Sequence, residues 1–177
     1  MPSYVAFLRA INLGATRKFP KADIKAAVES TGATGVETYI NTGNVRLTTT
    51  LRSRAKVEAA LEAAFLADRG FEVPTVVFTP AELCEVVADV DELWAVHGEP
   101  VAHAVTLFKL PPPASAVATV ESLDLGDRAV VRGRAAHVML VKNFHESKVL
   151  TSKQFAALGQ GTARYAKVLR ELTERWC

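Results

Sequence analysis

The chain has 177 residues, of which 49% are hydrophobic, so it can bury a core of ordinary size as one domain or as two small packed halves. Its formal net charge of +2, from 21 basic and 19 acidic residues, is too weak to indicate a generally basic binder of nucleic acid or membranes. This composition excludes the disordered and fibrous classes.

The two cysteines and the first residues indicate the compartment. Cys84 and Cys177 fit no metal-ligand spacing, so we expect two free thiols in a reducing cytoplasm and no metal site. The first ten residues carry neither a basic leader nor a long apolar run, which predicts no signal peptide and no membrane span. We therefore expect a cytoplasmic protein.

The first half alternates short apolar runs with helical stripes. Val57, Leu61 and Phe65 recur at helical spacing, and Gly43 supplies positive φ in a four-residue hairpin. The predicted elements are a strand at 3–8, a helix from Pro20 to Thr31, strands at 36–40 and 45–49, a helix at 52–69 and a strand at 73–78. This order of strand, helix, strand, strand, helix, strand is the ferredoxin-like pattern βαββαβ.

The second half begins where Thr79 to Glu82 resemble a capping box with proline at the first helical position. We place the boundary there, giving halves at 1–79 and 80–177. The later predicted elements are a strand at 104–110, a helix from the prolines at 111–113 to near 124, hairpin strands at 128–132 and 135–141, a short helix capped by Thr151 and Gln154, and a final helix with Tyr165, Val168, Leu169, Leu172 and Trp176 on one stripe. The predicted fold class is α+β, a ferredoxin-like N-terminal half packed with a smaller α+β C-terminal half.

Polar residues of the first half converge on one edge of its predicted sheet. With strand order four, one, three, two, the first two strands run parallel, and their carboxyl ends share that edge. A helix N-terminus beside cationic and amide groups suits a phosphate or carboxylate. The candidate ligand-binding residues there, which we call the rim, are Arg9, Asn12, Lys18, Asn41, Thr42, Gly43 and Asn44, with Arg17, Lys21 and Arg46 close by.

Each part of the rim also has a structural interpretation. The Asn and Gly residues of the hairpin satisfy the dihedral demands of a turn. Arg17, Lys18 and Lys21 suit a solvated loop and helix face. An arginine that ends an apolar strand needs a partner, and for Arg9 this is Asp23, Glu37 or a ligand.

The sequence offers less support for a metal site, a cofactor site or a nucleic-acid-binding surface. The four histidines (His97, His103, His137 and His145) have no zinc or haem spacing, and we expect them at the surface or satisfied in the core. Phosphate-loop and dinucleotide fingerprints are absent from the sequence, so we expect no cofactor. The third strand lacks the aromatic residues of an RNA-recognition sheet, which disfavours nucleic acid as a partner.

Three segments of the first half form recognisable motifs: V-A-F-L-R-A-I-N-L-G from Val5, R-K-F-P-K-A-D-I from Arg17 and T-Y-I-N-T-G-N-V from Thr38. In their order and spacing these segments resemble a known bacterial family, the domain of unknown function 1697. Later, F-T-P-A-E-L from Phe78 resembles the family's central segment, and T-A-R-Y from Thr162 resembles its Thr-x-Arg-Asn.

The resemblance implies an α+β protein with a ferredoxin-like first half and no established activity, cofactor or partner. Two departures concern glycine, which the family often has in place of Ala10 and Ala15, and Tyr165 replaces the family's asparagine. The family's polar motif positions fall on Arg9, Asn12, Lys18, Asn41, Gly43, Asn44, Thr162 and Arg164, which adds Arg164 to the candidate ligand-binding residues.

These residues favour a binding module for an anionic small molecule or for a phosphate of nucleic acid. One alternative is a small enzyme acting on a phosphorylated or acidic substrate, with Arg9 and Lys18 stabilising negative charge and His145 as the acid–base group. Another is an interaction or dimerisation scaffold that uses a sheet edge or the apolar stripe of the last helix. The oligomeric state and the share of the second half in the rim stay open at this point.

Overall fold

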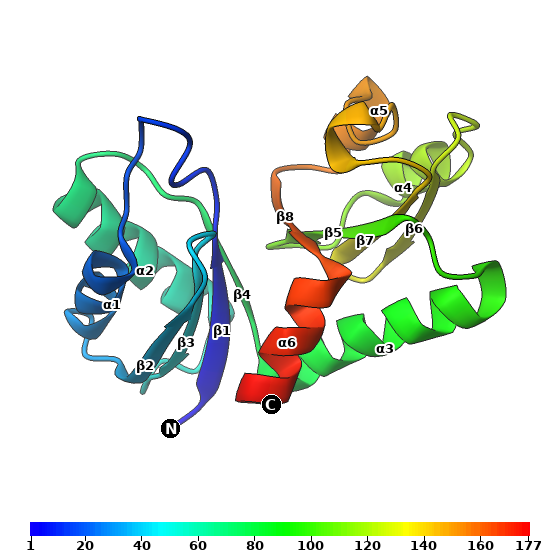
Figure 1. Ribbon diagram of the computed structural model, residues 1–177. Helices are drawn as coiled ribbons and strands as arrows, with labels where there is room; N and C mark the ends of the chain where they lie inside the picture. The colour runs from blue at the N-terminus through cyan, green and yellow to red at the C-terminus, as the bar shows by residue number, and fades with distance from the viewer. The chain divides into compact units, whose positions relative to one another are not determined.

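The computed structural model describes residues 1–177, and the chain forms two compact units (Figure 1). The first comprises Met1–Leu83 with Trp176–Cys177, and the second comprises Cys84–Arg175. The fold is α+β, with two four-stranded antiparallel sheets and six α-helices. The units divide after Leu83, inside helix α3 (Pro80–His97). The boundary predicted from the sequence lies four residues earlier, after Thr79.

The first unit contains one sheet and two helices that cover one of its faces (Figure 1). Its strands lie in the order β2-β3-β1-β4 with antiparallel neighbours, so β1 and β2 run parallel on either side of β3. The carboxyl ends of β1 and β2 therefore share an edge, as the sequence predicted. The elements are β1 (Ser3–Leu8), α1 (Lys21–Glu29), β2 (Thr34–Tyr39), β3 (Asn44–Thr48), α2 (Arg54–Arg69) and β4 (Thr75–Phe78).

Alternation along β1 divides its side chains between the two faces of the sheet. Tyr4, Ala6 and Leu8 belong to the core under α1 and α2, where the rings of Phe19 and Phe65 meet edge to face at 5.3 Å. Because β1 is buried from Tyr4 to Leu8, it has little room to shift register. The first unit thus gives the rim a rigid base.

The outer edge of β4 is closed by two carboxylates from α2. Glu62 accepts a hydrogen bond from the backbone N–H of Thr75 at 2.8 Å, and Glu58 accepts one from Val77 at 3.0 Å. These N–H groups point away from the sheet, where an unpaired edge would otherwise invite another strand.

Helix α3 begins with the predicted capping box. The Thr79 hydroxyl accepts from the backbone N–H of Glu82 at 3.2 Å, and the Glu82 carboxylate accepts from the backbone N–H of Thr79 at 2.8 Å. Two N–H groups at the helix start are thereby satisfied. The capping box is confirmed.

The second unit repeats the strand arrangement of the first. Its strands lie in the order β6-β7-β5-β8, again with antiparallel neighbours. The elements after α3 are β5 (Ala102–Phe108), α4 (Ala114–Glu121), β6 (Arg128–Arg132), β7 (Ala135–Leu140), the short 3-10 helix η1 (Phe144–Glu146), α5 (Lys153–Ala156), β8 (Gly161–Tyr165) and α6 (Ala166–Trp176).

Sequence reasoning missed strand β8. It placed Tyr165 on the final helical stripe, but Tyr165 ends β8 and the helix begins at Ala166. Gly161 allows β8 to lie against β5, because a Cβ there would be 2.6 Å from Cγ2 of Thr106 and 2.7 Å from the carbonyl oxygen of Leu107.

The cap of the short helix α5 also differs from the expectation. Ser152, rather than Thr151, is its N-cap, and its hydroxyl accepts from the backbone N–H of Phe155 at 3.0 Å. The Thr151 hydroxyl instead donates to the carbonyl of Ser147 at 2.9 Å.

None of the helices has both the length and the apolar composition that a membrane crossing requires.

Candidate functional site

The rim is assembled by backbone contact between the end of β1 and the β2–β3 hairpin. The N–H of Leu8 donates to the carbonyl of Gly43 at 2.8 Å. A Cβ at Gly43 would lie 2.7 Å from Cβ of Leu8 and 2.9 Å from Cδ1 of Ile11, and the φ of Gly43 is +79°. Both the close approach and the left-handed backbone require glycine at this position.

Asn12 ties the first loop to the same hairpin. Its amide group donates to the carbonyls of Asn41 at 2.8 Å and Phe19 at 3.1 Å, and its side-chain oxygen accepts from the N–H of Phe19 at 2.8 Å. Both amide hydrogens and the oxygen of Asn12 therefore have backbone partners. In this geometry Asn12 positions the rim.

The loop between β1 and α1 carries several residues with left-handed backbone. Ala10, Asn12 and Arg17 have φ values of 56°, 54° and 52°. The Arg17 guanidinium donates to the carbonyls of Ala10 and Glu72 and lies 4.5 Å from the centre of the Phe71 ring. Arg17 thus fastens the loop to the segment before β4.

Asn44 is fully buried at the start of β3. Its amide nitrogen donates to the carbonyl of Tyr39 and to the hydroxyl of Thr42, both at 3.0 Å. Ile40 in the same turn has a φ of 50°, which is rare for a β-branched residue. Asn41 and Thr42 are exposed, so the hairpin combines an internal brace at Asn44 with an accessible polar tip.

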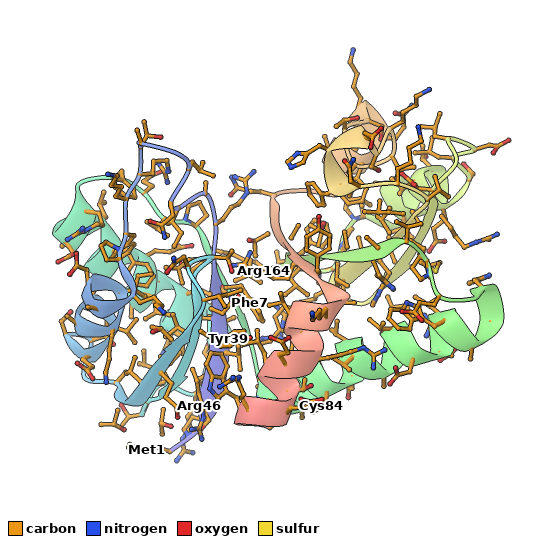
Figure 2. The ribbon with its side chains drawn as sticks, viewed as in Figure 1. Met1, Phe7, Tyr39, Arg46, Cys84 and Arg164 are labelled. Atoms are coloured by element: carbon orange, nitrogen blue, oxygen red, sulfur yellow. The ribbon has the colours of Figure 1, made fainter.

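The cationic side chains of the rim differ in their surroundings. Arg9 is half-buried, and its guanidinium has no hydrogen-bond or ion-pair partner. Neither acid considered from the sequence pairs with it, since Asp23 binds Arg69 at 3.1 Å and Glu37 binds Arg46 at 3.0 Å. Figure 2 labels one residue from each of three strands of the first unit's sheet: Phe7 of β1, Tyr39 of β2 and Arg46 of β3.

The start of α1 adds further positive potential. Lys18 and Lys21 are exposed, and Pro20 occupies the N-cap position without a side-chain hydrogen bond to the first turn. An uncapped first turn leaves backbone N–H groups available to solvent or to an anion. Asp23 in that turn is the opposing charge, and it is already paired with Arg69.

The remaining candidate, Arg164, belongs to β8 of the second unit. Its guanidinium donates to the hydroxyl of Thr162 at 2.9 Å and to the carbonyl of Ala163 at 2.8 Å. Burial lowers the pKa of Arg164 to about 10, so the side chain is positively charged at neutral pH.

The family assignment follows from a model of related sequences. The model described as "Protein of unknown function (DUF1697)" matches residues 1–137, which include the whole sheet of the first unit, with the first loop and the hairpin, and end within β7 of the second unit. The chain belongs to this family. No curated protein matches the chain.

A solved structure supports the fold of this DUF1697 protein. It is that of the conserved bacterial protein SP0830 from Streptococcus pneumoniae, with a TM-score of 0.77 at 20% sequence identity. The match covers 98% of this chain and 97% of the pneumococcal chain. At this identity the likeness concerns the fold.

Proposed function

We propose that this DUF1697 protein is a cytoplasmic binding module whose rim holds an anionic group, a phosphate or a carboxylate. The observation that carries the proposal is Arg9, a half-buried guanidinium without an acidic partner beside a loop and a hairpin that are fixed to each other. A partly desolvated cation without a counter-ion is a favourable place for an anion.

The rim residues divide into two roles under this proposal. Arg9 and Lys18 supply charge, and the exposed Asn41 and Thr42 supply polar groups at the hairpin tip. Asn12, Gly43 and Asn44 hold the loop and the hairpin in place through the contacts described above. We further propose that the first unit is ferredoxin-like, which the strand order β2-β3-β1-β4 supports.

A thermal-shift screen tests this function. The probes are inorganic phosphate, nucleotides, phosphorylated sugars, dicarboxylates and short single-stranded RNA. A ligand at a hundred times its Kd stabilises the folded state by about 2.7 kcal/mol, or roughly 5–10 °C in Tm for a chain of this size. We expect a hit that is lost in Arg9→Gln.

Lys56→Gln is the matched control, because Lys56 is an exposed cation on α2 and its replacement removes the same charge. A hit that weakens equally in both variants would report general electrostatics and contradict the proposed site.

A further inference from the structure

A chain of hydrogen bonds inside the second unit joins helix α3 to two strands. The Trp94 indole N–H donates to Nδ1 of His103 at 2.9 Å, and Nε2 of His103 lies 3.1 Å from Nδ1 of His137. Because β5 and β7 pair Val105 with His137, the two histidines are diagonal neighbours on one face of the sheet. They are 3% and 0% exposed, so water does not compete for these bonds.

The chemistry of the first donor fixes the direction of the whole chain. An indole nitrogen only donates, so Nδ1 of His103 accepts and the ring hydrogen of neutral His103 lies on Nε2. That hydrogen is donated to Nδ1 of His137, which leaves the hydrogen of His137 on its own Nε2. Both imidazoles are therefore neutral and in the same tautomer.

The last nitrogen of these hydrogen bonds lies near a carboxylate of the helix on which they begin. Nε2 of His137 is buried without a hydrogen-bond partner, and the charged group in front of it is Oδ2 of Asp89 at 4.0 Å. Asp89 also accepts from Arg132 at 2.8 Å, and both oxygens of Glu92 accept from that same guanidinium at 3.0 Å. The hydrogen bonds thus run from Trp94 of α3 to His137 of β7, and the last nitrogen lies 4.0 Å from Asp89 of the same helix α3.

The charged groups around the pair come from three elements. Helix α3 contributes Asp89 and Glu92, and β6 contributes Arg132. Helix α6 contributes Arg170, whose guanidinium lies 4.7 Å from the centre of the Trp94 ring and also pairs with Asp91. Burial, with the neighbouring positive charges, lowers the pKa of His103 to about 3 and that of His137 to about 4.

We propose that Trp94, His103, His137 and Asp89 form a proton-sensitive latch that fastens α3 to the sheet of the second unit. In the neutral pair, each nitrogen without a hydrogen already accepts one. A proton added to either ring sets two N–H groups against each other, at the Trp94–His103 contact or at the His103–His137 contact. Uptake of one proton therefore breaks one of the two hydrogen bonds.

Opening the latch removes polar contacts and leaves apolar ones. Val86, Val90 and Leu93 of α3 are buried and carry no charge, so their packing does not depend on pH. The expected acid state is a folded protein in which α3 is loosened near Trp94.

Imidazole nitrogen NMR of the whole protein tests the neutral state of the latch. At pH 7 the nitrogen shifts of His103 and His137 should both report a hydrogen on Nε2, with the His103 hydrogen coupled across its bond to His137. A hydrogen on Nδ1 of either ring, or a charged ring at pH 7, would overturn the proposal.

Fluorescence tests the opening. In Trp176→Phe, Trp94 is the remaining tryptophan, and its emission should change reversibly with a midpoint near pH 4 while far-UV circular dichroism stays constant. His137→Gln should abolish this change or move its midpoint by at least one pH unit, and His145→Gln should leave it in place.

Two results would overturn the latch. One is an emission change that occurs only together with the loss of circular dichroism, and the other is an identical transition in His137→Gln. If His137→Gln does not fold, nitrogen shifts of the wild-type protein decide the question. The latch then requires the first of the two rings to gain its proton in the same pH range as the Trp94 change.

Discussion

At the scale of single residues, the first loop uses left-handed backbone at a position that is not glycine. Ala10 has a φ of 56°, and this conformation costs an L-residue roughly 1–2 kcal/mol. The DUF1697 family often has glycine at this position. The left-handed backbone explains this preference, because glycine adopts positive φ without strain. Ala15, the other position where the family often has glycine, does not have positive φ.

Replacing Ala10 therefore gives a matched pair of variants. Ala10→Gly should raise the free energy of unfolding by roughly 0.5–1 kcal/mol, because relief of the left-handed backbone exceeds the entropy that glycine adds to the unfolded chain. Ala15→Gly should leave stability unchanged or lower it. Urea unfolding of both variants is the measurement, and equal effects would contradict the argument.

Gly43 tests steric closeness separately from backbone conformation. Gly43→Ala should lower the free energy of unfolding by roughly 2–4 kcal/mol, because it adds overpacking against Leu8 and Ile11 to a left-handed backbone. Gly32→Ala is the control, since Gly32 has a similar φ of +83° and no atom within 4 Å of a new Cβ. Its loss should be about 1 kcal/mol. Similar losses in the two variants would show that the close approach has little effect.

At the scale of elements, the helix starts differ in how their backbone groups are satisfied. Thr79 accepts a hydrogen bond from the first turn of α3, whereas Ser53 at the N-cap of α2 makes no side-chain cap bond. Thr79→Ala should therefore cost about 1 kcal/mol of stability, and Ser53→Ala should cost a few tenths. Denaturation midpoints measured at constant m-value check the difference, and a larger loss in Ser53→Ala would contradict it.

Most elements were predictable because their signals are local. The apolar helical stripe followed by Gly70 predicted where α2 ends, and the Asn and Gly residues predicted the β2–β3 hairpin. The predicted bounds of these elements lie within one or two residues of the observed ones. Strand β8 was missed because its five residues run directly into a helix and begin with Gly161, which resembles a break. The reason for that glycine is contact with β5, which lies far away in sequence.

The site was predictable only in part. Its residue types can be seen in short stretches of the sequence, but the ion pairs and hydrogen bonds that these residues form depend on residues far away along the chain. Sequence order placed the hairpin and the first loop at one edge of a sheet, and the Asn12–Asn41 contact joins them there. Which acids remain for Arg9 depends on Arg69 and Arg46, which take Asp23 and Glu37. The histidine pair had no spacing signal, since it depends on register between β5 and β7.

At the scale of the whole molecule, the buried histidines couple stability to pH. An unfolded histidine takes up a proton below pH 6.5, whereas His137 and His103 stay neutral in the folded protein until about pH 4 and 3. The folded state then binds fewer protons than the unfolded state, so stability falls as pH decreases. Each histidine contributes a slope of roughly 1.4 kcal/mol per pH unit between about pH 5.5 and 4.5.

Urea unfolding of the wild type and of His137→Gln across this range measures the slope. The histidine contribution should be halved in His137→Gln, and it should be unchanged in His97→Gln, because His97 is exposed. An unchanged slope in His137→Gln would mean that carboxylates alone determine the acid sensitivity.

The return of the chain to its first unit at Trp176 affects how that unit is completed during synthesis. The Trp176 indole donates to the Glu37 carboxylate at 3.2 Å across a sequence separation of 139 residues. All of residues 84–175 leave the ribosome between these two partners. The entropy cost of closing a loop rises only slowly with its length. The long separation therefore postpones the Trp176–Glu37 hydrogen bond in time and adds little to the free-energy cost of forming it. The first four strands can pair early in translation, whereas the contact at Glu37 forms after the second unit has been made.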